Sequence, residues 1–156
     1  MTTITSNHRA ARVVVAALLV AICSMFLQIE PASAALARGA EDTFEARINK
    51  ARQNHGLRPL RVKVDLVTLA RKQCYAMASS NTLFHSPNLG NTITNARRWG
   101  ENVGYGYSVA SIHRMLIESP GHRANILSRY YTQMGVGVQK MPDGKLWVTQ
   151  VFRQPL

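Results

Sequence analysis

Residues 135–152 read GVGVQKMPDGKLWVTQVF, a pattern that indicates a β-sheet covered on both faces. Valine alternates with glycine before a Pro-Asp-Gly turn, and residues 146–152 alternate between two faces after it, which predicts an antiparallel hairpin. In the second strand Trp147 and Phe152 fall on opposite faces, and both faces carry apolar residues. Because a strand that is apolar on both faces is covered on both sides, we expect helices on each face of the sheet.

The spacing of apolar residues, caps and turn-forming residues predicts the elements that precede this hairpin. In chain order they are a helix over residues 41–55, a helix capped by Asp65 and ending near Ser80, a loop over residues 85–95, a short helix over residues 97–99, a strand over residues 100–106, a helix capped by Ser108 and a helical turn over residues 121–127. The sequence therefore predicts a mixture of helices and strands.

Residues 1–34 have the features of a secretory signal peptide. Arg9 and Arg12 precede an apolar run over residues 13–27, and small residues provide a cleavage site after Ala34. A transmembrane helix needs about 20 apolar residues, so this run is short for a membrane span. We expect a signal peptide over residues 1–34 and one exported domain over residues 35–156. An uncleaved N-terminal anchor is the alternative, and retention in the periplasm or at the envelope stays open.

Charge and cysteine content exclude several classes of protein. The chain has 19 Lys and Arg residues against 8 Asp and Glu residues, a formal net charge of +11, which favours anionic partners such as the cell envelope. The basic residues are spread along the chain, so nucleic acid is not an expected partner. The chain's 2 cysteines cannot form a disulfide framework or a four-thiolate zinc site. Cys74 falls on the apolar stripe of its helix, where we expect a buried, unreactive thiol.

Several short motifs together carry a family resemblance. They are His85-Ser86, Gly100-Glu101-Asn102, SPGHRANIL at residues 119–127, GVGV at residues 135–138 and WVTQVF at residues 147–152. With these motifs in this order, the chain from Phe44 to Phe152 resembles the CAP superfamily of cysteine-rich secretory proteins, antigen 5 and pathogenesis-related 1 proteins, in its bacterial SCP-like extracellular branch. The resemblance implies an α+β fold, an α-β-α sandwich with a central antiparallel sheet flanked by helices.

The resemblance also implies a surface cleft lined by histidines and glutamates. Carried over residue by residue, His85, Glu101 and His122 match the family's cleft residues. The better-studied eukaryotic members have a second glutamate, at a position where this chain has Ser119, with Glu118 one residue earlier. Two imidazoles and a carboxylate are suitable ligands for zinc with an open position, and Glu118 is the remaining candidate for a fourth ligand.

Other interpretations of the same residues stay open. His122 can cap its helical turn, Glu101 can accept backbone hydrogen bonds and His85 can order the loop, in which case the cluster is structural. Ser86 with a histidine and Glu101 can also be drawn as a hydrolase triad, although the chain has no G-x-S-x-G elbow.

Three classes of function follow, in order of preference. The first is a secreted, non-enzymatic module that binds an apolar or amphipathic ligand or the anionic cell envelope, since the family has members associated with lipid and sterol binding. The second is a metal-dependent or serine hydrolase acting on peptides or cell-wall material. The third is a structural interaction domain. The sequence favours a protein that is not an enzyme.

Overall fold

A four-stranded sheet forms the middle layer of the part of the chain that the computed structural model describes, residues 32–156. Its strands are β1 (Arg61–Val62), β2 (Arg98–Gly106), β3 (Gln133–Lys140) and β4 (Leu146–Gln154), in the order β1-β3-β4-β2. The three long strands are antiparallel, and the two-residue β1 pairs in parallel with β3. The predicted hairpin is confirmed, with Val138 opposite Val148.

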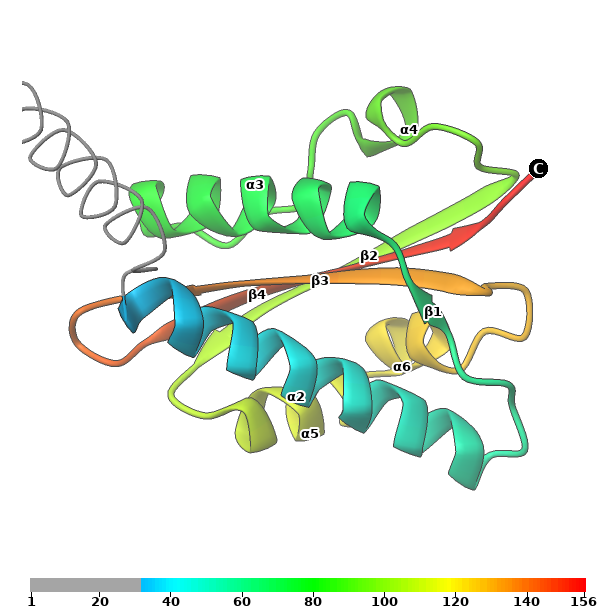
Figure 1. The fold of residues 1–156 in the computed structure, drawn as a ribbon, viewed down its shortest axis with the longest axis horizontal. Helices are drawn as coiled ribbons and strands as arrows, with labels where there is room; N and C mark the ends of the chain where they lie inside the picture. The colour runs from blue at the N-terminus through cyan, green and yellow to red at the C-terminus, as the bar shows by residue number, and fades with distance from the viewer. Residues whose placement is uncertain (1–31) are drawn as a thin grey trace, which may run out of the picture. The chain divides into compact units, whose positions relative to one another are not determined.

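Helices cover both faces of this sheet (Figure 1). One face carries α3 (Val64–Ser80) and, beyond it, the single turn α4 (Leu89–Thr92). The other face carries α2 (Ala32–Asn54), α5 (Val109–Glu118) and α6 (Pro120–Ile126). The predicted α+β class and the α-β-α layering are therefore confirmed. The predicted signal peptide lies almost wholly outside the described residues, and residues 33–156 form one unit.

Two apolar layers hold the helices on the sheet. Phe152 packs with Phe44 and Ile48 of α2 and with residues of α5 and α6, whereas Trp147 packs with Cys74 and Met77 of α3. Both aromatic side chains are buried, which confirms that β4 is covered on both sides. Among residues 32–156, no helix combines the length and apolar character that crossing a bilayer would take.

The buried thiol is also confirmed. Cys74 is a free cysteine in the α3 layer, and its Sγ lies 3.0 Å from the carbonyl oxygen of Gly137 and 3.3 Å from Oγ1 of Thr149. Burial raises the pKa of the Cys74 thiol to about 12, so the thiolate that a nucleophile requires is not formed near neutral pH.

Three predicted local features are wrong. Residues 97–99 do not form a helix, because β2 begins at Arg98 and the extended backbone pairs with β4, where Arg97 N donates to Gln154 O at 2.8 Å. Asp65 does not cap α3, because its carboxylate instead accepts from the buried Arg153 at 2.6 Å and supplies that guanidinium with a counter-charge. The predicted loop over residues 85–95 contains the turn of α4.

Two glycines of β3 set how closely α3 approaches the sheet. A Cβ atom on Gly135 would lie 2.2 Å from main-chain atoms of Leu66 and Val67, and one on Gly137 would lie 2.4 Å from those of Ala70 and Arg71. Real side chains do not tolerate such distances to backbone, so only glycine allows this contact. The two glycines of the GVGV motif are therefore required for α3 to pack on the sheet.

Gly135→Ala should lower the free energy of unfolding by about 3 kcal/mol, at the upper end of the usual cost of overpacking, because main-chain atoms of α3 cannot rotate away as a side chain can. Urea denaturation measures the change. The matched control is Gly121→Ala on α6, where nothing lies within 4 Å of the added Cβ, and its stability should be unchanged or slightly raised. Equal stability of the two variants would contradict the close approach of α3.

Candidate functional site

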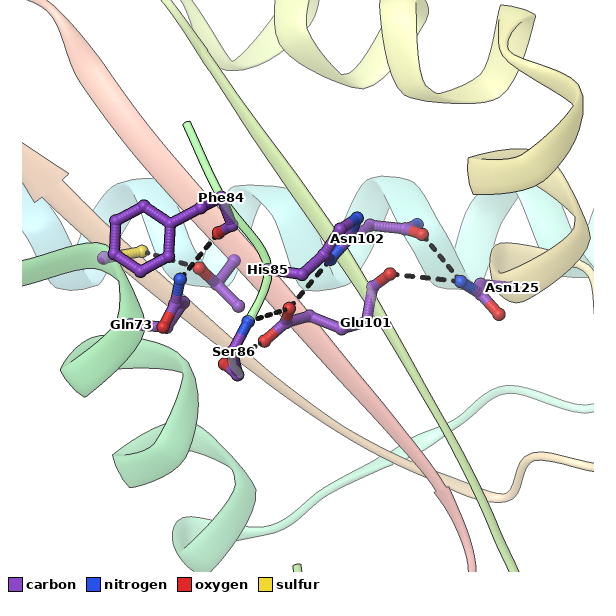
Figure 2. A network of polar contacts seen from close by, with 9 residues as sticks. Gln73, Phe84, His85, Ser86, Glu101, Asn102 and Asn125 are labelled. Atoms are coloured by element: carbon purple, nitrogen blue, oxygen red, sulfur yellow. Dashed lines mark hydrogen bonds and ion pairs between the residues drawn. The ribbon is translucent and has the colours of Figure 1, made fainter. Parts of the chain in front are cut away.

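The segment that carries His85 and Ser86 is folded back over α3. The helix ends at Ser80, as predicted, because Asn81 adopts a left-handed conformation with φ of 48°. The carbonyl oxygen of Phe84, four residues after Ser80, accepts a hydrogen bond of 2.6 Å from Nε2 of Gln73, a buried residue of α3. Figure 2 shows this contact beside the Glu101 cluster, so α3 fixes the backbone that precedes His85.

Glu101 of β2 is the centre of the polar cluster in Figure 2. Its side chain is only 5% exposed. Oε1 accepts from the backbone N–H of Ser86 at 2.8 Å and contacts Nδ1 of His85 at 2.9 Å, while Oε2 accepts from the Ser86 hydroxyl. One buried carboxylate thus holds two consecutive residues of the loop, and three residues predicted from their motifs meet here.

The hydrogen bond to Glu101 assigns a role to each nitrogen of His85. An ionised carboxylate only accepts hydrogen bonds, so Nδ1 is the protonated nitrogen. Nε2 is then the nitrogen that can accept a hydrogen bond. Because the His85 side chain is 60% exposed, this nitrogen is accessible to a solute.

A second polar network joins α6 to the strands below the cluster. Nδ2 of Asn125 donates to the carbonyl oxygen of Glu101 at 3.2 Å and to Oδ1 of Asn102 at 2.9 Å. Nδ2 of Asn102 in turn donates to the carbonyl oxygen of His122 and to Oε1 of Gln150, at 3.1 Å each. These amides position the backbone on both sides of Glu101 and fix the turn that carries His122.

His122 lies within electrostatic range of His85. Its Nδ1 is buried and has no hydrogen-bond partner among the described residues. Burial, followed by the charge that His85 can carry, lowers the pKa of His122 below its ordinary value of 6.5. His122 is therefore neutral at pH 7. Glu118, at the exposed last residue of α5, is not joined to this cluster by any hydrogen bond or ion pair among residues 32–156.

A family model matches most of the chain. The family model "CAP: Cysteine-rich secretory protein family" matches residues 45–152. This chain belongs to the CAP family. The resemblance of the sequence motifs is confirmed, and His85, Glu101 and His122 all lie inside the matched residues of this CAP domain.

Proteins similar to this CAP domain include three from bacteria. The uncharacterized protein YkwD of Bacillus subtilis is 31% identical in an alignment of 111 residues that covers 65% of this chain and 42% of YkwD, so the chain spans less than half of that relative. An outer surface protein of Borrelia burgdorferi has a TM-score of 0.70 at 14% identity, over 76% of this chain and 94% of its own. An extracellular SCP-domain protein of Bacillus anthracis has a TM-score of 0.69 at 23% identity, over 81% of this chain and 44% of its own. Because both sequence identities are below 25%, these two structures show that the fold is similar and nothing further.

The three candidate zinc ligands His85, Glu101 and His122 are not arranged as a preformed zinc site. Both oxygens of Glu101 already accept hydrogen bonds from His85 and Ser86, and among residues 32–156 no three His, Cys, Asp or Glu side chains are grouped to hold a metal ion. Glu101 accepts three of the about four hydrogen bonds that a carboxylate can accept, so it has little capacity left to bind a zinc ion. The zinc site stays a prediction, tested below.

The geometry does not assemble a serine nucleophile. In a catalytic triad the serine hydroxyl bonds to the histidine, and the carboxylate orients the far side of the ring. Here the carboxylate does contact His85 Nδ1, but the Ser86 hydroxyl donates to the same carboxylate and not to the ring. Both donors of Ser86 and Nδ1 of His85 bond to Glu101, and these contacts hold the loop in place.

Glu101→Gln should lower the free energy of unfolding by about 2 kcal/mol, because hydrogen bonds to a charged group contribute about 1.5 to 3 kcal/mol and three donors converge on this carboxylate. Hydrogen exchange of the Ser86 amide should accelerate in the same variant. The matched control is Glu118→Gln, an exposed carboxylate on α5, which should change stability by less than about 0.5 kcal/mol. Indistinguishable melting curves for the two variants would contradict the structural role of Glu101.

The same melting curves test the zinc site. If the three residues bind zinc, added zinc chloride should raise the melting temperature of the wild type and not that of Glu101→Gln, relative to samples in chelator. Equal melting temperatures of the wild type with zinc and with chelator would rule out the predicted site.

His122 should titrate with a midpoint below 6.5, measured from the NMR shift of its ring Cε1 proton. Because the folded state then binds fewer protons than the unfolded state, His122 stabilises the fold fully above about pH 6.5, and this contribution is lost as the pH falls through its lowered pKa. Glu45 has the opposite effect on the pH dependence of stability. Burial raises its pKa to about 7, so its contribution to stability increases as the pH falls. The contribution of His122 is therefore measured by comparing the wild type with His122→Asn. From pH 7 to pH 5 the free energy of unfolding should fall less in His122→Asn than in the wild type. A midpoint at or above 6.5 would contradict the burial of this ring.

Proposed function

We propose that this CAP domain is an exported, non-enzymatic binding module that takes an amphipathic ligand into a cavity between α3 and residues 84–92. The observation that carries the proposal is the cavity itself. It has a volume of about 330 Å³, and most of its lining surface is apolar, with Leu69, Ala76, Phe84 and Leu89 among the residues that contribute. Ligand-binding pockets have volumes of roughly 300 to 1,000 Å³ and mostly apolar walls.

The Glu101 cluster supports this proposal because it holds one wall of the cavity. Ser86 lines the cavity, and both its backbone N–H and its hydroxyl donate to Glu101. Phe84 lines it as well, and its carbonyl oxygen is fixed by Gln73 of α3. A loop held by buried polar contacts at two points forms a preorganised wall, which reduces the ordering cost of binding.

The charge at the rim favours a ligand with an anionic head. Lys72 lines the cavity from α3, and no Asp or Glu lines it. The uncharged polar lining consists of Gln73, Ser86, Asn88 and Thr92, of which Gln73 and Ser86 already make the hydrogen bonds described above. An acyl chain with a terminal carboxylate would place its apolar body against Leu69 and Phe84 and its head near Lys72.

Export is supported by the predicted signal peptide and by the neighbours. The Borrelia burgdorferi protein is an outer surface protein and the Bacillus anthracis protein is extracellular. The net charge of +11 suits attachment of an exported domain to an anionic envelope. Function outside the cytoplasm is therefore part of the proposal.

The wild type should bind the fluorescent fatty acid 11-(dansylamino)undecanoate saturably, and Ala76→Phe should weaken this binding at least about tenfold, because the ring fills the cavity. Lys72→Gln should weaken it about twofold to fivefold by removing the charge at the rim. The matched control is Ala46→Phe, at an exposed position of α2 on the other face of the sheet, which should bind as the wild type does.

Two results would contradict the proposal. One is the absence of saturable binding by the folded wild type, which would favour a purely structural interaction domain. The other is unchanged affinity in a folded Ala76→Phe variant, which would place the ligand elsewhere on the domain.

A further inference from the structure

Arg52 carries a buried charge at the end of α2, on the other face of the sheet from the proposed ligand cavity. The residue is 1% exposed. Its Nε donates to the carbonyl oxygen of Arg58 at 2.9 Å, and Nη1 donates to those of Ile126 and Ser128 at 2.8 and 2.9 Å. Nη2 donates to the carbonyl oxygen of Tyr131 at 3.4 Å. One guanidinium thus joins the segment after α2 to the segment after α6.

The partners of Arg52 within residues 32–156 are all neutral carbonyl oxygens. A guanidinium has five N–H donors, so four hydrogen bonds leave one N–H unused. Buried charges in proteins are normally paired with an opposite charge, and desolvation lowers the pKa of Arg52 because that compensation is missing. Most N–H groups of the buried Arg52 guanidinium therefore have hydrogen-bond partners. Its positive charge, however, is not neutralised by a negative group among the described residues.

Three further arginines surround the same place. A hollow of about 740 Å³ is lined by Arg52, Arg58, Arg61 and Arg129, together with Leu57, Thr132 and neighbouring residues. Arg58, Arg61 and Arg129 are exposed, and no Asp or Glu lines the hollow. In Figure 1 the end of α2, β1 and the segment between α6 and β3 meet at one end of the sheet, which explains how arginines so far apart in sequence converge. We call this set of four arginines the arginine basin.

The acidic residues of the described chain are occupied or placed elsewhere. Glu41 pairs with Arg71, Asp65 pairs with Arg153, and Glu101 holds the His85 loop. The carbonyl groups at the C-terminal end of α2 supply only about half a negative charge. That partial charge cannot neutralise four guanidinium groups, so the arginine basin keeps a strong positive potential.

The side chain of Arg129 contacts an aromatic neighbour, Tyr130. Its Nη2 donates to the hydroxyl of Tyr130 at 3.2 Å, and its guanidinium lies 5.1 Å from the centre of that ring. The guanidinium of Arg98 lies 4.2 Å from the same ring. Cations held over an aromatic ring lose less freedom when they bind a ligand. Arg129 is thus presented to the hollow in a partly ordered form.

From this geometry we infer that the arginine basin binds a phosphate group. The planar, forked guanidinium matches phosphate oxygens with paired hydrogen bonds, and clustered arginines are the usual recognition element for such groups. A bound phosphate would supply the counter-charge that Arg52 lacks and relieve the repulsion among the three exposed arginines. The source is either a phosphate compound in solution or the headgroup of an acidic phospholipid. The site is separate from the cavity beside α3 and does not depend on its function.

The test uses the full chain and a charge-matched pair of triple variants. In the first variant Arg58, Arg61 and Arg129 are each replaced by Gln. In the second, Arg47, Arg114 and Lys140, which are exposed elsewhere, are each replaced by Gln, so that the net charge of the two variants is the same. Calorimetry with sodium pyrophosphate measures the solution arm, and co-sedimentation with phosphatidylcholine vesicles containing phosphatidylglycerol measures the lipid arm.

The wild type should bind in at least one arm, and the basin variant should lose at least about tenfold in affinity while the control variant loses less than about threefold. Saturable binding of pyrophosphate identifies a soluble phosphate ligand, and binding to vesicles alone identifies a lipid headgroup. An equal loss in both variants would overturn the inference, because the attraction would then come from net charge. Failure of the folded wild type to bind in either arm would overturn it as well.

Discussion

The close contact between α3 and β3 is the constraint on which the rest of this CAP domain depends. Because Gly135 and Gly137 have no side chain, the backbone of α3 rests directly on the sheet, where any Cβ would collide with it. This fixes the height of α3 above β3. It thereby sets the height above the sheet at which α3 ends and the chain turns back at Asn81 toward the edge strand β2.

The position of α3 makes the Glu101 cluster geometrically possible. Gln73 projects from α3 to hold the carbonyl oxygen of Phe84, and the next two residues then reach the carboxylate on β2. The buried charge of Glu101 is balanced by donors from a loop rather than by a basic partner. Such a carboxylate stabilises one loop conformation, because any other conformation would leave it unpaired in a largely buried site. The loop in turn forms the wall of the cavity beside Leu69.

Much of the fold was predictable from the sequence because it follows from local patterns. The alternation in residues 135–152, the Ser108 cap, whose side chain accepts from the Ser111 N–H, and the apolar stripes of the helices each specify one element. The failures have a common cause. Asp65 was predicted from local capping chemistry, but a partner 88 positions away in sequence, Arg153, competes for it. The extended conformation of Arg98 depends on pairing with β4, which no local pattern shows.

The candidate site was only partly predictable for the same reason. The motifs identified His85, Ser86, Glu101 and His122, but nothing local shows that Glu101 accepts three hydrogen bonds from the two residues of one motif. Asn102 and Asn125 belong to the quoted motifs, yet their role in joining β2 to α6 emerges only when the strands pair.

The arginine basin was outside the reach of sequence reasoning. Its members are spread over more than 70 residues and converge because the end of α2 lies beside the segment that follows α6. From the sequence they contribute only to a diffuse positive charge. In the structure the same charges gather around one buried guanidinium.

The most direct measurement of the central claim, that the fixed loop and α3 enclose a ligand cavity, is a residue-resolved NMR titration of the wild type with sodium decanoate. The largest amide shift changes should occur at the cavity-lining residues Leu69, Ala76, Ser86 and Leu89 and should saturate together. Shift changes that are largest at His122 and Asn125, or absent from the cavity, would contradict it.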